Sequence, residues 1–310
     1  MLFTKIKIFL FRLVRKFVPI IWRFKSTNND YIFSQYLEEE ISLLKTGTSW
    51  DNFQFKIYSE IKRLGFSRFR LSPTIISTMD PPMPFLISSV MFLNTSDYIY
   101  LKKLANNYNK IGGGLRGTMF FSVPDSRIQK ILTLIELKAE LNKYYASNFE
   151  INSHRSFEFV EFGGGIGQFA ELVIRELSPT SYTIIDLPLV SALARYYLNH
   201  QKINIHPSFV SSEKELVFSK ESIKVFVSSW AISELKLSRR KQIEEYMAKM
   251  DYLFIEMQES FDNIDNYEWI KEFLNRNPQY RSTWSKSNRA MRSRVYKIYR
   301  IPEKSANSLL

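Results

Sequence analysis

The sequence predicts an α/β fold with a mostly parallel sheet and an antiparallel last strand, preceded by a mainly helical N-terminal region. From residue 156 onward, short β-rich apolar runs alternate with helical segments, which is typical of βαβ units around a parallel sheet. A glycine-rich turn joins the first of these runs to the first helix. The last two runs are only about eight residues apart, which leaves no room for a crossover helix and predicts an antiparallel pair.

The predicted elements divide the chain into four parts, which are residues 1–25, 26–150, 151–302 and a tail at 303–310. Residues 26–30 are polar and form a linker to predicted helices at 31–45, 52–64, 96–110 and 126–146, of which the last has the clearest helical spacing. The strands are predicted at 157–162, 181–186, 203–206 (a weak one), 223–229, 251–257, 279–285 and 294–300. Between them, helices are predicted at 167–177, 188–199, 235–248 and 266–275.

The composition indicates a folded chain whose body is nearly neutral. Of its 310 residues, 45% are hydrophobic and 15% aromatic, whereas disordered chains are poor in aromatic residues. The absence of cysteine excludes disulfides and thiolate metal sites, and it favours the cytoplasm. The net charge of +12 arises in residues 1–25 and 281–300, which each hold seven basic residues and no acid, so the rest carries −2.

Several partners are compatible with the two basic stretches. Residues 281–300 form a solvated face, or contact an anionic substrate, a lipid headgroup or nucleic acid. Nucleic acid is the less favoured partner, because enzymes that act on it more often spread basic residues along a whole face. Residues 1–25 have too short an uncharged run to span a bilayer. They resemble a helix that lies on an anionic membrane surface, or one that packs on its own domain or on a second subunit.

A ligand-binding turn is predicted at the end of the first strand. The strand at 157–162 runs into Gly163, Gly164, Gly165 and Gly167 with Glu161 in front, and a helix follows. Glycines in this position let the backbone approach a ligand closely. The second strand ends in Asp186, about 20 residues on, where an acid accepts hydrogen bonds from ribose hydroxyls.

The spacing of the turn distinguishes between cofactors. A dinucleotide site has the pattern G-x-G-x-x-G and holds a pyrophosphate, whereas this turn reads G-G-G-x-G after an acid. Because Glu161 would repel a pyrophosphate, a cationic ligand such as S-adenosylmethionine (SAM) fits better.

These motifs resemble those of class I SAM-dependent methyltransferases, whose sheet is Rossmann-like. The segments F-V-E-F-G-G-G-I-G, Y-T-I-I-D-L-P and S-S-W-A-I-S-E-L look like the bacterial putative sugar O-methyltransferase family, over roughly residues 110–280. The resemblance implies that Gly163, Gly165 and Gly167 approach the methionine part of SAM and that Glu161 orients the turn or the amino group of SAM. It further implies that Asp186 holds the ribose and that Leu187 packs near the adenine. Gly164 and Ser229 complete the expected cofactor-binding residues.

The methyl acceptor should bind beyond the carboxyl ends of the strands, where open α/β sheets bind ligands. Transfer to a hydroxyl needs a proton acceptor, and the candidates are Glu234 after the strand 223–229, Glu256 at the end of the next strand, and His154. Glu234 also fits a simple first-turn acid of the next helix. The spacing of acids and histidines predicts no metal site.

The sequence therefore predicts a cytoplasmic SAM-dependent O-methyltransferase that acts on a sugar or surface-glycan precursor, with residues 26–150 as a lid over the acceptor. Attachment to the inner membrane surface and assembly into an oligomer are both left open. The alternatives are an RNA methyltransferase, suggested by a pI of 9.6, and a non-catalytic SAM-fold module at the membrane.

Overall fold

A computed structural model of the chain describes residues 50–79, 86–108, 111, 123–148, 156–210, 216–287 and 293–301. Several predicted features lie outside these residues, namely the basic segment 1–25, the helix 31–45, His154 and the tail 303–310. The chain folds as two compact units, one of residues 1–131 and 187–201 and the other of residues 132–186 and 202–310. None of the helices that the structure describes is both long and apolar enough to cross a bilayer.

The described residues of the first unit form helices. Its elements are α3 (Asp51–Leu64), the 3₁₀-helix η1 (Phe66–Leu71), α4 (Pro73–Thr78), α5 (Leu86–Met91), α6 (Thr95–Asn106), the start of α7 (Asp125–Asn148), and α9 (Pro188–Asn199). The predicted helices 52–64 and 126–146 are thus present, whereas the one predicted at 96–110 ends at Asn106. Helix α4 was not predicted. It begins where Ser72 accepts a hydrogen bond from the N–H of Ile75 and Pro73 occupies the first helical position, which are common signals of a helix start.

Helix α9 is bound to the first unit although it lies far along the chain. Its Tyr196 ring lies 5.7 Å from that of Phe66 and 6.1 Å from that of Phe69. The fully buried Gln54 of α3 accepts a hydrogen bond from the N–H of Leu189 at 3.2 Å. These contacts join the segment after Asp186 to residues of the N-terminal half.

The second unit contains the predicted sheet. Its strands are β1 (Phe157–Phe162), β2 (Ser181–Ile185), β3 (Ser208–Val210), β4 (Ile223–Ser229), β5 (Tyr252–Gln258), β8 (Tyr280–Lys286) and β9 (Ser293–Arg300). They are ordered β3-β2-β1-β4-β5-β9-β8. The first five are parallel, and β9 is antiparallel to both β5 and β8. This confirms the mostly parallel sheet and the antiparallel pair at its end.

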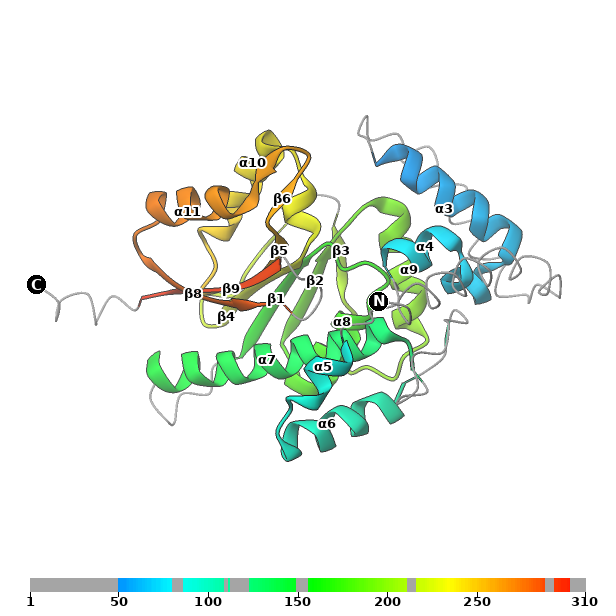
Figure 1. Ribbon diagram of the computed structural model, residues 1–310, viewed down its shortest axis with the longest axis horizontal. Coiled ribbons are helices and arrows are strands. Elements are labelled where there is room, and N and C mark those ends of the chain that lie inside the picture. The colour runs from blue at the N-terminus through cyan, green and yellow to red at the C-terminus, as the bar shows by residue number, and fades with distance from the viewer. Residues whose placement is uncertain are drawn as a thin grey trace, which may run out of the picture. The chain divides into compact units, whose positions relative to one another are not determined.

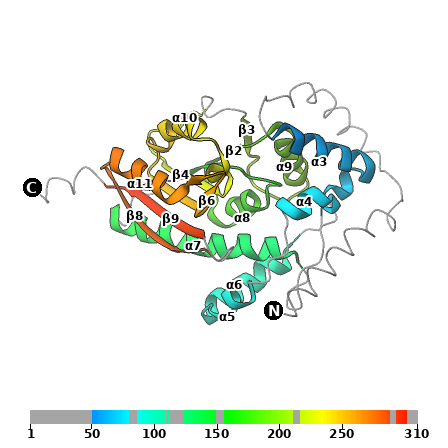
Figure 2. The same ribbon diagram turned by 45° about the horizontal axis from the view of Figure 1, so that its top comes forward.

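Helices cover both faces of this sheet. Figure 1 shows α7 and α8 (Gln168–Leu177) on one face, with α10 (Leu237–Met247) and α11 (Asn266–Arg276) on the other, and Figure 2 agrees. Under α10 and α11, Ile243, Met247 and Phe273 pack with Phe226 and Ile298 of the sheet, and all five are buried. Each such side chain contributes roughly 1.5–3 kcal/mol through burial.

Three details of the second unit differ from the prediction. The weak strand predicted at 203–206 lies a few residues later, at β3, because the residues that pair with β2 begin at Ser208. The helix predicted at 235–248 begins at Leu237, because the 3₁₀-helix η3 (Ala231–Glu234) precedes it and Leu235 is extended. A small hairpin, β6 (Ser260–Phe261) and β7 (Ile264–Asp265), was missed. Its two linking residues, Asp262 and Asn263, have positive φ, which is typical of two-residue hairpin turns.

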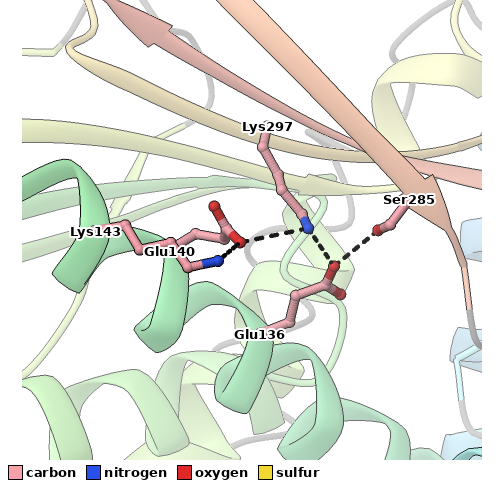
Figure 3. A network of polar contacts seen from close by, with 5 residues as sticks. All are labelled: Glu136, Glu140, Lys143, Ser285 and Lys297. Carbon is pink, nitrogen blue, oxygen red and sulfur yellow. Dashed lines mark hydrogen bonds and ion pairs between the residues drawn. The ribbon is translucent and has the colours of Figure 1, made fainter.

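Part of the basic stretch 281–300 has partners inside the protein. Lys297 on β9 forms ion pairs with Glu136 at 2.8 Å and Glu140 at 3.7 Å on α7, and only 12% of its side chain is exposed. Ser285 on β8 also donates to Glu136, at 2.8 Å, and Lys143 pairs with Glu140 (Figure 3). Lys297 therefore binds β9 to α7 and is not part of a solvated face.

Candidate cofactor and acceptor site

The glycine-rich turn after β1 has a backbone conformation that side chains rarely adopt. The φ angles of Gly163, Gly165 and Gly167 are 77°, 55° and 80°, in the region that glycine enters without a steric penalty. Gly167 caps the start of α8, and the N–H of Gly163 donates to the carbonyl of Ile185 at 2.9 Å. The turn is thereby held against the end of β2.

The two sides of the turn differ in the space around them. A Cβ atom built on Gly163 would lie 2.0 Å from the Cβ of Ala231 in η3, whereas a Cβ on Gly165 would meet no atom within 4 Å. The turn therefore packs tightly against the segment after β4, while open space lies beside Gly165. Open space above a glycine turn is what a closely bound ligand needs.

Replacing Gly163 by alanine should destabilise the fold by about 2–5 kcal/mol, because the strain of a positive φ adds to a clash with Ala231 that no side-chain rotation relieves. Gly165→Ala is the matched control, since it has the same kind of strain without the clash. It should cost about 1–3 kcal/mol. Urea unfolding of both variants measures the difference, and equal losses would mean that the contact with Ala231 is not tight.

Glu161 lies beneath the turn in a fixed position. Its side chain is 4% exposed, and the hydroxyl of Tyr182 donates to its Oε2 at 2.9 Å. A Cβ on Gly164 would lie 3.2 Å from the same oxygen and 2.8 Å from Ile184. Burial, reinforced by the charge of Glu161, raises the pKa of Tyr182 well above its usual value. Tyr182 therefore stays a neutral donor that holds the carboxylate under the turn.

Asp186 meets the turn directly. It follows β2, is partly exposed, and its Oδ2 accepts a hydrogen bond from the N–H of Gly165 at 2.8 Å. The acid that the sequence placed at the end of the second strand is thus in contact with the glycines. A carboxylate has about four acceptor positions, so this bond leaves Asp186 capacity for other donors. Leu187, the next residue, is partly exposed and caps the start of α9.

A strained turn follows β4, and the sequence did not predict it. Trp230 has φ 73°, which costs a residue with a side chain about 1–3 kcal/mol. Its N–H donates to the carbonyl of Glu256 at 2.8 Å, and Ser233 donates to its carbonyl through both N–H and hydroxyl, at 2.9 and 2.6 Å. These bonds hold Trp230 beside Ser229 at the end of β4, and such strain is often found at functional sites.

The two acids expected at the acceptor site, Glu234 and Glu256, have different environments. Glu234, the last residue of η3, is partly exposed, whereas Glu256 on β5 is 2% exposed and accepts a hydrogen bond from Ser287. Ser229 and Glu256 are partners in the β4–β5 register, so both acids belong to the same edge of the sheet. Within the described ranges, no group of three His, Asp or Glu residues could hold a metal ion.

Arg240 is a buried residue that the sequence did not single out. It donates to the carbonyl oxygens of Leu235 at 2.9 Å and Ser233 at 2.6 Å, and to Oδ1 of Asn266 at 2.7 Å. Its guanidinium also lies 5.0 Å from the ring of Trp269. Burial lowers its pKa to about 10, so it remains charged at neutral pH. Arg240 thus joins the segment that carries Glu234 to the start of α11.

No protein-family model and no curated protein matches the sequence. Solved methyltransferase structures are distantly similar to parts of the chain. Magnesium protoporphyrin IX methyltransferase from Synechocystis PCC 6803 is 11% identical, with a TM-score of 0.38 over 70% of this chain and 97% of its own. The N-methyltransferase NodS from Bradyrhizobium japonicum WM9 is 16% identical, with a TM-score of 0.39 over 55% and 87% of the two chains.

A SAM-dependent methyltransferase from Aquifex aeolicus is 13% identical, with a TM-score of 0.40 over 52% of this chain and 88% of its own. By its own topology the second unit has a Rossmann-like α/β fold, a mostly parallel seven-stranded sheet with helices on both faces.

Proposed function

We propose that the chain is a SAM-dependent O-methyltransferase that methylates a hydroxyl of a sugar or surface-glycan precursor. The observation that carries the proposal is the hydrogen bond between Asp186 and Gly165, beside open space at the turn. It puts a carboxylate suited to ribose hydroxyls next to a backbone suited to close approach. The sugar part of the proposal rests on the motif resemblance.

The charge of the turn fits a cationic ligand. Glu161 is held in place by Tyr182 directly beneath Gly164, and its negative charge attracts a sulfonium or an ammonium group. Gly163, Gly165 and Gly167 would approach the methionine part of SAM, while Leu187 would pack against its adenine. When bound, SAM supplies a methyl group on a positively charged sulfur.

The remaining chemistry is done by residues at the ends of β4 and β5. We assign Glu234 as the group that takes the proton of the acceptor hydroxyl, because it is the partly exposed acid of the rim. The buried Glu256 instead holds the rim together, through its carbonyl bond to Trp230 and its bond to Ser287. Much of the rate would come from alignment of the hydroxyl oxygen with the methyl carbon and sulfur.

Isothermal titration calorimetry with S-adenosylhomocysteine tests the donor half of the proposal. Saturable binding is expected, and its absence would contradict the proposal. Transfer of tritiated methyl from SAM to nucleotide sugars and to extracted surface polysaccharide tests the acceptor half. Preferential labelling of RNA would favour an RNA methyltransferase, and binding without any transfer would favour a non-catalytic module.

Glu234→Gln separates proton transfer from binding. The variant should bind S-adenosylhomocysteine like the unchanged protein, because Glu234 lies outside the glycine turn. Its turnover should fall by about 10²–10⁴, the usual contribution of a general base. Unchanged turnover would shift the role to another group, with Glu256→Gln as the next variant to measure.

The membrane contact proposed for residues 1–25 can be tested directly. Flotation with vesicles that contain anionic phospholipid should retain the full chain but not a chain that lacks residues 1–25, and high salt should release it.

A further inference from the structure

An arginine lies between two aromatic rings at the open edge of the sheet. The guanidinium carbon of Arg294 on β9 is 4.1 Å from the ring centroid of Trp284 on β8 and 4.1 Å from that of Tyr267 on α11. Both distances are well inside the ~6 Å range of a cation–π contact. We call these three residues the arginine stack.

The register of the hairpin explains how the stack forms. Trp284 pairs with Tyr296, and Lys286 pairs with Arg294, on strands β8 and β9. Residues two apart on a strand point to the same face, so all four share the face that α11 covers. The opposite face carries Lys297, which pairs with Glu136 and Glu140 (Figure 3). The two faces of the hairpin therefore carry different basic residues, with Lys297 on the α7 face and Lys286 and Arg294 on the α11 face.

The stack is preorganised but still accessible. Tyr296 is buried, contacts the Tyr267 ring at 6.2 Å, and its hydroxyl accepts from Arg294 at 3.4 Å. Trp284 is 52% exposed although Arg294 covers one side of its ring, and Lys286 is exposed as well. Packing in the core does not account for the position of Trp284, because half of its surface remains exposed. It offers a surface for stacking with charge next to it.

The stack lies at the same end of the sheet as the proposed acceptor site, the end where β5 finishes and β9 begins. The start of β9 lies beside the end of β5, with Gln258 opposite Ser293 and Glu256 opposite Val295. Ser287, the residue after Lys286, donates to Glu256. Arg294 itself pairs with Met257 near the end of β5, whereas Glu256 points to the opposite face. An acceptor would therefore reach the arginine stack by passing over the carboxyl end of β5.

We propose that the arginine stack and Lys286 bind an acidic ring of the acceptor, a pyranose that bears a carboxylate or a phosphate. This inference rests on the proposed function and names the acceptor class. The apolar face of a pyranose would pack on Trp284, while the edge of the Arg294 guanidinium and the ammonium of Lys286 bind the anionic group. Because two rings hold Arg294 in place, little side-chain entropy is lost on binding.

The surroundings favour an acidic sugar over nucleic acid. Asp265 lies at the start of α11, where it accepts from the N–H groups of Tyr267 and Glu268. Its negative charge repels a run of phosphates more strongly than a single anionic group, and a carboxylate can also accept hydrogen bonds from sugar hydroxyls. One half-exposed indole ring beside two cations also matches one ring with one charged group better than a run of stacked bases.

Calorimetry on the full chain saturated with S-adenosylhomocysteine tests the proposal. The probes are tetragalacturonate for a carboxylate, glucose 6-phosphate for a phosphate, maltotetraose as the neutral control, and a single-stranded oligouridylate. At least one acidic sugar should bind about 10-fold more tightly than maltotetraose, as expected for one charged hydrogen-bonding pair. Equal affinity for acidic and neutral sugars, no binding of either acidic sugar, or tighter binding of the oligouridylate would each overturn the proposal.

Variants show whether the binding uses the stack. Trp284→Ala and Arg294→Gln should each lower the affinity for the acidic probe about 10-fold or more. Trp284→Phe should retain most of the affinity that Trp284→Ala loses. Arg281→Gln is the matched control, because Arg281 is exposed on β8 but lies on the other face. It should change affinity less than about twofold. Equal effects of Arg281→Gln and Arg294→Gln would mean non-specific attraction and would overturn the proposal. Affinity for S-adenosylhomocysteine should be unchanged throughout, so failure of the donor site remains distinguishable.

Discussion

Replacing Asp186 by alanine should weaken the binding of S-adenosylhomocysteine by at least ~100-fold. The carboxylate supports the site in two ways, since it accepts the N–H of Gly165 and is expected to accept ribose hydroxyls. Hydrogen bonds to a charged group contribute about 1.5–3 kcal/mol each, so the loss of two or more corresponds to a factor of ~10²–10³ or greater. Calorimetry with S-adenosylhomocysteine measures the change.

Asp186→Asn serves as the matched control for this prediction. The amide keeps one oxygen that can accept from Gly165 but no longer accepts at two oxygens. We expect an intermediate loss of about 10-fold with little change in stability. If Asp186→Ala bound S-adenosylhomocysteine like the unchanged protein, the ribose role would be wrong, and the contact with Gly165 would be purely structural.

The parts that the sequence predicted share a local cause. Strands buried on both faces have nearly continuous apolar sequences. For this reason β1, β2, β4 and β5 begin and end close to their predicted bounds. The glycine turn was predictable because residues at positive φ are mostly glycine. The acid after β2 could be placed beside it, because adjacent parallel strands end at the same edge of the sheet.

The parts that were missed depend on contacts distant in sequence. Trp230 adopts a positive φ because Glu256 and Ser233 hold its backbone, and no local pattern predicts that conformation for tryptophan. The short strand β3 is fixed by its pairing with β2 and not by its own alternation. The hairpin β6–β7 did carry a signal, the Asp262-Asn263 pair, which the sequence reasoning did not use.

Arg240 is the clearest example of a role that only the fold defines. In the sequence it is one of two consecutive arginines on a charged helix, yet Arg239 is partly exposed and bonds Gln242 within α10. Arg240 is fully buried and donates to three acceptors, two in the segment that carries Glu234 and one at the start of α11. Which of two adjacent arginines points inward depends on how α10 packs, and the weak apolar pattern of this helix does not decide it.

Arg240→Met should therefore destabilise the protein by about 3 kcal/mol or more in urea unfolding. Methionine fills much of the volume but leaves the carbonyl oxygens of Ser233 and Leu235 and the amide of Asn266 without their donor, at about 1–3 kcal/mol for each buried group that stays unsatisfied. Arg240→Lys should lose less, because an ammonium retains the charge but cannot reach all three acceptors. Arg239→Met is the control and should stay within about 0.5 kcal/mol of the unchanged protein.

The same variants distinguish a structural role from a positioning role in the acceptor site. Arg240 contacts the segment that carries Glu234 and does not contact the glycine turn. Among molecules that remain folded, Arg240→Lys should therefore bind S-adenosylhomocysteine normally while methyl transfer slows. Because Ser233 and Leu235 flank Glu234 in the chain, a displaced carbonyl on either side moves the proposed base. If binding and transfer fell together, or if neither fell, Arg240 would only stabilise the fold.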